Sequence, residues 1–267
     1  MKLETTKLPY LPNSESLLFN LSPKGGLVAL ESSLPNHENG RWSIISAEPC
    51  ETLNLIDPQN NQELMTRLTN MHSKLPPSNL DLPFTGGVIG HASYDLGLPN
   101  TERRADGATP TIIAGLYTWA FLLDHKSKCT TLIYVSGPAK TSKKELINIF
   151  TRSIDKSPEL LPLKVTSTFK AAWSKAQYQN SIKAIHKYIN AGDAYQVNLA
   201  QTFSSTYSGN PISGYQKLKK FAGVPFSSYF EHEDFSFASA SPELFISINQ
   251  TEITTKPIKG TLPRSTQ

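Results

Sequence analysis

Near its end the chain reads Ser241-Pro242-Glu243-Leu244-Phe245 and, after a short interval, Pro257-Ile258-Lys259-Gly260-Thr261-Leu262-Pro263-Arg264. Between the two segments lie alternating residues, the polar pair Asn249-Gln250, and alternating residues again. Alternation on both sides of a polar turn predicts a β-hairpin. Glu243 precedes the first predicted strand and Lys259 follows the second, so we expect both at the open end of the hairpin.

An acid and an amine held together on rigid strands can act as a proton donor beside a nucleophile. The alternative for Glu243 and Lys259 is a surface ion pair, which is the commoner fate of such neighbours. The flanking residues favour a ligand site, because Pro242 restricts the backbone and Gly260 lets a ligand approach the main chain. The pair is therefore a candidate catalytic site.

Two further side chains of this segment suit a small substrate that carries a carboxylate. Thr261 offers a hydroxyl, and Arg264 offers a guanidinium fork that matches a carboxylate. The alternative for Arg264 is a solvated side chain beside the terminus.

Composition argues against several other classes of protein. The 267 residues carry a net charge of +4 with scattered Lys and Arg, so no nucleic-acid groove is predicted. The two cysteines, Cys50 and Cys129, have neither metal-ligand nor redox spacing, and we expect both thiols to be buried and inert. No apolar segment has the length to span a bilayer, and the start has no signal-peptide core. We expect a soluble, cytoplasmic protein that does not bind membranes.

Along the whole chain, the hairpin included, the sequence predicts strands in an antiparallel arrangement together with four helices. Strands are expected at 17–21, 27–31, 41–45, 112–124, 129–135, 193–203, 226–230, 235–240, 244–248 and 252–255. Helices are expected at 60–75, 142–154, 174–191 and 211–221. Segment 157–170 looks like a connector, which divides the chain into regions 1–156 and 171–267.

Several residues predict local features of the structure. Gly86, Gly87 and Gly90 in an apolar strand predict close backbone packing, and the Lys and Ser or Thr of a phosphate loop are missing. His91 is interpreted as structural, because no partner has metal-site spacing. Ser174 opens a capping box, and Gly192 ends that helix with a left-handed residue.

Two groups of polar residues could face a ligand. Gln196 and Asn198 share one face of the strand predicted at 193–203, where they either line a polar cavity or are half-exposed. Ser236, Ser239 and Ser241 stand among small residues and leave room for a ligand at that edge.

Segments Leu82 to Gly97, Ala191 to Gly209 and Ser241 to Arg264, with Leu30-Glu31-Ser32 near the start, resemble the chorismate-binding family in the same order along the chain. This family includes the large subunits (component I) of aminodeoxychorismate synthase and anthranilate synthase. Within it, Lys259 resembles the aminodeoxychorismate branch, since the anthranilate branch usually carries Ala there.

The resemblance implies an α+β fold with two large antiparallel sheets packed as a sandwich and helices outside. It also implies chorismate as substrate, Mg²⁺ as cofactor, and ammonia supplied by a glutamine amidotransferase partner, giving 4-amino-4-deoxychorismate for p-aminobenzoate and folate synthesis. By resemblance Lys259 adds to the ring while Glu243 protonates the departing 4-hydroxyl, and ammonia then displaces the lysine. Thr261 and Gly260 match residues of the substrate pocket.

The family also has a tryptophan pocket in its N-terminal sheet. Residues that match the segments lining it are Leu30, Glu31, Ser32, Arg41 and Trp42. The alternative for these residues is plain sheet packing.

Family members are much longer than this chain and continue with an acidic metal-binding helix and a glycine-rich segment. The resemblance therefore implies an N-terminal part of the large subunit, incomplete at its C-terminus, with no metal ligand in this chain and no activity alone. The alternatives are an anthranilate synthase-type enzyme and a non-catalytic remnant that binds tryptophan or the amidotransferase.

Overall fold

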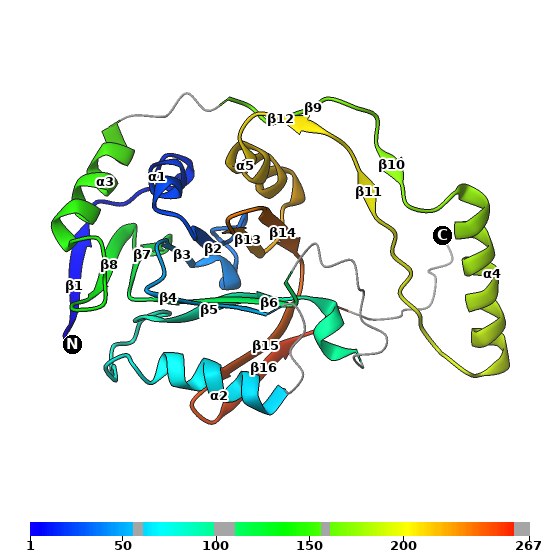
Figure 1. Ribbon diagram of the computed structural model, residues 1–267, viewed down its shortest axis with the longest axis horizontal. Helices are drawn as coiled ribbons and strands as arrows, with labels where there is room; N and C mark the ends of the chain where they lie inside the picture. Colours follow the sequence, from blue (N-terminus) through cyan, green and yellow to red (C-terminus); the bar gives the residue numbers. More distant parts are fainter. Residues whose placement is uncertain (56–60, 99–109, 156–160, 259–267) are drawn as a thin grey trace. The chain divides into compact units, whose positions relative to one another are not determined.

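The computed structural model describes residues 1–55, 61–98, 110–155 and 161–258 (Figure 1). The chain divides into one compact unit of Met1–Glu159 with Tyr215–Gln267 and another of Leu160–Gly214. Strands from both predicted regions, 1–156 and 171–267, join one sheet of the first unit. The two regions themselves remain a prediction.

The main sheet of the first unit has seven strands, and every neighbouring pair is antiparallel. In order across the sheet the strands are β1 (Leu3–Leu8), β8 (Cys129–Val135), β7 (Trp119–Asp124), β3 (Trp42–Ser46), β2 (Val28–Glu31), β13 (Phe226–Glu231) and β14 (Ser236–Ser241).

A three-stranded antiparallel sheet and a hairpin complete the strands of this unit. The sheet runs β4 (Glu51–Leu55), β6 (Ile112–Tyr117) and β5 (Gly87–Ala92), and the hairpin pairs β15 (Leu244–Asn249) with β16 (Glu252–Lys256). The second unit holds two short pairs, β10 (Lys170–Ala171) with β11 (Phe203–Ser204) and β9 (Lys164–Val165) with β12 (Tyr207–Ser208).

The helices that the structure describes are α1 (Glu15–Leu21), α2 (Asn61–His72), α3 (Lys143–Asp155), α4 (Lys175–Ala191) and α5 (Pro211–Ala222), with short 3₁₀ turns at Ser22–Lys24, Glu38–Gly40 and Tyr94–Gly97. None of these described helices has the length and apolar character required to cross a membrane.

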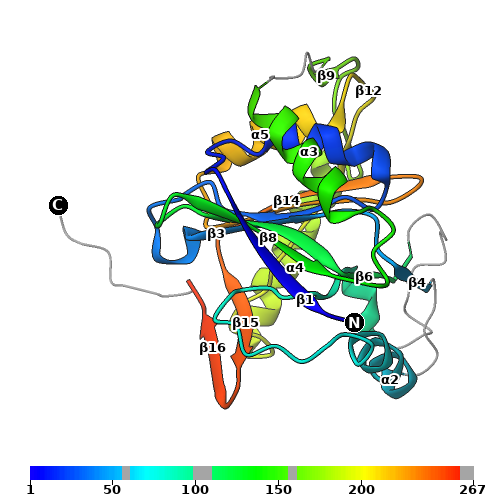
Figure 2. The same cartoon turned by 90° about the vertical axis from the view of Figure 1, so that its left-hand side faces the viewer.

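Helices α2 and α3 lie on opposite outer sides of the stacked sheets of the first unit (Figure 2). The two sheets face each other across a cluster that contains Val28, Ile113 and Phe230. On the outer side of the smaller sheet, α2 inserts Leu64 into a second cluster. On the outer side of the larger sheet, the Phe150 ring of α3 stacks on Phe121 of β7 at 5.2 Å. The expected α+β fold, with packed antiparallel sheets and helices outside, is confirmed, although the second sheet has only three strands among the described residues.

The strand expected at 17–21 is wrong, because this segment is helix α1. Leu17, Leu18 and Leu21 are all fully buried, and their spacing places them on one side of a helix. In so short an apolar run, helical and strand patterns overlap, so periodicity alone cannot separate them.

The single strand expected at 112–124 is also wrong, since the chain forms β6 and β7 in different sheets. The break falls at Thr118, whose carbonyl accepts a hydrogen bond from the Val135 N–H at 2.7 Å. Every residue of both strands is buried. A run that is buried on both faces shows no alternation of polar and apolar residues, so the single threonine at the break does not identify a change of sheet.

The strand expected at 193–203 is wrong for most of its length. Only Phe203 belongs to a strand, and the described chain places no paired strand beside residues 193–202. A strand needs a neighbouring strand for its backbone hydrogen bonds, and the alternation of apolar and polar residues does not show whether such a neighbour is present. Gln196 and Asn198 are exposed, so the predicted polar cavity does not form around them in the described structure.

Features that depend on residues close in the sequence were predicted more accurately than these strands. The Ser174 capping box forms with both of its hydrogen bonds, and Gly192 ends α4 with φ of 84°. At Gly90 an added Cβ would lie 2.3 Å from the Ile113 carbonyl oxygen, which confirms the close backbone packing. The two cysteines are free but half-buried rather than buried, with burial raising the pKa of Cys50.

Candidate functional site

The predicted hairpin forms and brings Glu243 to its open end. Leu244 pairs with Lys256, and the turn passes through Gln250, which has φ of 53°. The Lys256 ammonium pairs with Glu38 of the neighbouring 3₁₀ turn, which ties this end of the hairpin to the unit. The predicted site residues Lys259, Gly260 and Thr261, together with Arg264, lie outside the described residues.

Hydrogen bonds of the Ser241 side chain fix the main chain at Glu243. The Ser241 hydroxyl donates to the Glu243 carbonyl oxygen at 3.1 Å and accepts from the Glu243 N–H at 3.4 Å. Glu243 is half-buried at the junction of β14 and β15. The main chain around this carboxyl group is therefore held in place.

Ser241 also lines a pocket of about 330 Å³ on β2, β3, β13 and β14. Three residues of the predicted tryptophan site, Leu30, Glu31 and Trp42, line this pocket, and so does Ser239. The room for a ligand predicted beside Ser239 and Ser241 is therefore present. Aliphatic and aromatic walls with a few hydroxyls suit a small flat ligand. We call this space the Leu30 pocket.

The Glu31 carboxylate is hydrogen-bonded by side chains of α5 and by Ser14. It accepts hydrogen bonds from the Ser14 hydroxyl at 2.6 Å, the Tyr215 hydroxyl at 2.8 Å and the Lys219 ammonium at 3.1 Å. Burial, and then the nearby Glu31 charge, raise the pKa of Tyr215. A carboxylate with three protein donors is a fixed part of the wall.

Ser32 faces a different cavity, of about 410 Å³, which also reaches Glu31. His125 lines this cavity, with Nδ1 2.8 Å from the Tyr10 hydroxyl and Nε2 2.8 Å from the Ser43 hydroxyl. Burial lowers the pKa of His125. Ser32 and Leu30 therefore line separate cavities.

Arg41 is engaged in a charge pair away from the Leu30 pocket. Its guanidinium donates to Asp124 at 2.8 Å and lies 4.7 Å from the centre of the Trp42 ring. Burial alone would raise the pKa of Asp124, but hydrogen bonds from Arg41 and Ser127 outweigh it and hold that pKa well below its usual range. Arg41 and Trp42 also border a larger space beside the hairpin turn.

Sequence reasoning missed most of the partners that hold this site. Ser14, Tyr215 and Lys219 belong to helical segments, and the last two are 184 and 188 residues from Glu31. His125 follows the strand predicted at 112–124, and no role was predicted for it. No local pattern marks such residues, because their roles arise from tertiary contacts.

Metal binding finds no support among the residues that the structure describes. They contain no group of three His, Cys, Asp or Glu side chains placed to hold a metal ion. His91, read as structural, packs against the Phe237 ring with centroids 4.1 Å apart, and burial lowers its pKa. The described residues therefore offer no place for Mg²⁺.

The sequence profile of a family described as chorismate binding enzyme matches residues 30–267. Aminodeoxychorismate synthase component 1 of Klebsiella aerogenes is 32% identical over 96% of this chain and 60% of its own length. Anthranilate synthase component 1 of Lactococcus lactis is 27% identical over 89% of this chain and 56% of its own length. The chain thus spans little more than half the length of these relatives.

A solved structure extends the likeness to the fold. Anthranilate synthase component I of Streptococcus pneumoniae superposes with a TM-score of 0.66 at 22% identity, covering 81% of this chain and 53% of that one. This likeness bears on the fold alone.

Proposed function

The chain belongs to the family of chorismate-binding enzymes, and from this premise we propose that it is part of an enzyme that converts chorismate and ammonia to 4-amino-4-deoxychorismate. Support comes from the match to aminodeoxychorismate synthase component 1 over 96% of the chain. Lys259 favours the aminodeoxychorismate branch over the anthranilate branch, since the anthranilate branch usually has Ala at this position. Because the relatives are longer, the isolated chain is expected to be inactive.

The proposed roles follow from the chemistry of the substrate. The Lys259 amine forms a C–N bond to the ring while the C–O bond to the 4-hydroxyl breaks, and Glu243 gives that oxygen a proton so that water leaves. Hydroxide is a poor leaving group, which makes acid assistance necessary. Ammonia then forms the new C–N bond as the bond to the lysine breaks, and a proton lost from the incoming nitrogen returns to Glu243, which regenerates the enzyme.

Lys259 must be neutral when it attacks, so the proposal requires its surroundings to lower its pKa. Thr261 and Gly260 are proposed to contact the substrate. A glutamine amidotransferase is the proposed ammonia source. Family members use Mg²⁺, which would act as a Lewis acid on the substrate. The described residues do not fit this ion, so none of them is given a part in its binding.

A second candidate function is tryptophan binding in the Leu30 pocket. One observation favours it: Leu30, Glu31 and Trp42, predicted from the resemblance, line one space of about 330 Å³. Isothermal titration of the chain with L-tryptophan tests it. Binding that is lost in Ser239→Trp but kept in Ser208→Trp, a serine of the second unit, would support the assignment.

The synthase proposal is tested with protein made from the complete genomic reading frame, supplied with chorismate, ammonium and Mg²⁺. Chromatography should show 4-amino-4-deoxychorismate, and Lys259→Ala should abolish its formation while Lys256→Ala retains it. Anthranilate as the product would refute the proposal in favour of the other branch. Turnover by the isolated 267-residue chain would contradict its expected inactivity.

A further inference from the structure

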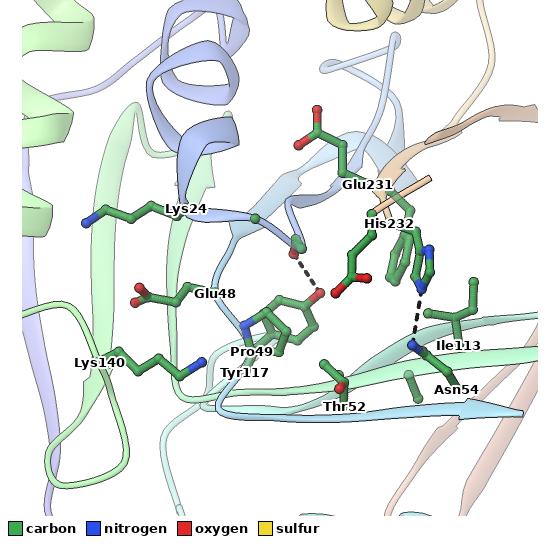
Figure 3. Close-up of a pocket in the computed structure, with 16 residues that line it drawn as sticks. Lys24, Glu48, Pro49, Thr52, Asn54, Ile113, Tyr117, Lys140, Glu231 and His232 are labelled. Atoms are coloured by element: carbon green, nitrogen blue, oxygen red, sulfur yellow. Dashed lines mark hydrogen bonds between the residues drawn. The ribbon is translucent and has the colours of Figure 1, made fainter. Parts of the chain in front are cut away.

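A cavity of about 320 Å³ opens between the two sheets of the first unit, at the opposite end of β13 from the Leu30 pocket (Figure 3). It is bounded by the Gly25-Gly26 turn, the Glu48-Pro49 turn, strands β4 and β6, and residues 230–233. None of the residues proposed above for catalysis or tryptophan binding lines it. We call it the inter-sheet cavity.

The floor of this cavity is rigid. The Tyr117 hydroxyl donates to the Gly26 carbonyl oxygen at 2.8 Å, and the Glu48 N–H donates to Gly25 at 2.7 Å. Glu48 has φ of 54°, an uncommon conformation for a residue with a side chain. At Gly115 an added Cβ would come within 2.9 Å of Tyr117 and 2.8 Å of Pro49. The absent side chain leaves the Tyr117 ring and Pro49 packed as an apolar floor.

Strand β4 presents polar side chains to this space. Leu53 is buried in the cluster with α2, so alternation directs Thr52 and Asn54 toward the other sheet. Facing sheets in a sandwich usually bury apolar residues there. The Asn54 amide nitrogen lies 3.1 Å from Nε2 of His232, which holds the Asn54 side chain in place. Thr52 and Asn54 therefore border an open, polar side of the cavity.

Most charged groups around the cavity are already committed. Lys24 pairs with Glu145, and the Glu48 carboxylate accepts from the Thr141 N–H and hydroxyl. The Glu231 carboxylate accepts from the hydroxyls of Ser22 and Tyr229 at 3.0 Å each. Their side chains are parts of the wall rather than contacts for a ligand.

Lys140 and Glu233 are the remaining charges, and neither has a hydrogen-bond or ion-pair partner in the part of the chain that is described. Figure 3 shows the Lys140 ammonium directed toward Tyr117, while the charged ends of Lys24 and Glu48 point away from it. Glu233 also lines the cavity. An unpaired cation and an unpaired anion therefore both border this space.

We propose that the inter-sheet cavity binds a free α-amino acid with an apolar side chain, whose carboxylate meets Lys140, whose ammonium meets Glu233 and whose side chain lies against Pro49. The volume stands at the small end of ligand pockets, which run from roughly 300 to 1,000 Å³. A single amino acid fits this volume, whereas a nucleotide needs more. A ligand with only one of the two charges leaves the other protein charge unmatched.

Isothermal titration of the whole 267-residue chain with L-phenylalanine tests this site. Phenylpropionate, which lacks the ammonium, and phenethylamine, which lacks the carboxylate, are the matched probes. We expect L-phenylalanine to bind up to about fivefold more tightly than either, since Lys140 and Glu233 are exposed and an exposed ion pair contributes up to about 1 kcal/mol. Equal affinities for the three compounds, or no binding of L-phenylalanine, would overturn the proposal.

Charge-removing variants assign the two contacts. Lys140→Met should weaken L-phenylalanine up to about fivefold and leave phenethylamine unchanged, while Glu233→Gln should weaken L-phenylalanine by a similar factor and leave phenylpropionate unchanged. Lys126→Met and Glu252→Gln, at exposed positions away from the cavity, serve as controls and should bind like wild type. Thermal denaturation checks that each variant is folded. Binding that survives both cavity variants but is lost in Ser239→Trp would place the ligand in the Leu30 pocket and refute the assignment.

Discussion

Replacing Lys219 by Met should be the most damaging single change at the surface of α5. It leaves the Glu31 carboxylate, with a side chain only 3% exposed, without its cation. Breaking a buried ion pair costs about 3–5 kcal/mol, and we expect the lower end, about 3 kcal/mol, because Ser14 and Tyr215 still donate to Glu31. With an m-value of about 3 kcal/mol per molar urea, the unfolding midpoint should fall by about 1 M.

Urea titrations followed by tryptophan fluorescence measure this, since Trp119 is buried in the main sheet. Lys220→Met, at the exposed neighbour on the same helix, should stay within about 0.5 kcal/mol of wild type. The double variant Glu31→Gln with Lys219→Met should be more stable than Lys219→Met alone, because no unpaired charge remains buried. The reasoning fails if Lys219→Met matches wild type or if the double variant is the less stable of the two.

Three further changes probe other parts of the fold. Burial lowers the pKa of His125, so the neutral imidazole contributes to the free energy of unfolding above about pH 6.5, and this contribution is lost as the pH falls through the folded-state pKa. Wild type should therefore lose up to about 1.4 kcal/mol of stability per pH unit more than His125→Gln. Parallel urea midpoints from pH 7 to 5 would contradict this. Gly90→Ala should cost about 3 kcal/mol or prevent folding, whereas Gly97→Ala, with open space around it, should be neutral by thermal melting. Ser174→Ala should destabilise α4 by about 1 kcal/mol, seen as faster amide exchange in its first turn, and unchanged exchange there would count against the capping box.

Features encoded by neighbouring residues could be predicted from the sequence. The hairpin, the Ser174 capping box and the left-handed Gly192 each depend on residues within one turn or one strand pair. Segments whose state depends on distant contacts could not. Helix α1 and the change of sheet at Thr118 lie in largely apolar runs, in which the few polar residues do not reveal the period.

The same limit explains the outcome at the candidate site. The prediction from sequence placed Leu30, Glu31 and Ser32 around one ligand because they are adjacent in the chain. In a strand successive side chains point to opposite faces, so Leu30 reaches the Leu30 pocket while the Glu31 carboxylate turns to Lys219.

The strand register shows which residues share a face of the sheet with Leu30. Leu30 pairs with Ile44 on one side and with Ser228 on the other, and Ser228 pairs with Ser239. Residues paired in this way across adjacent strands point to the same face, and all four line the Leu30 pocket. The side chains that line this pocket are therefore set by a row across the sheet, in which only Leu30 belongs to the segment that first marked the site.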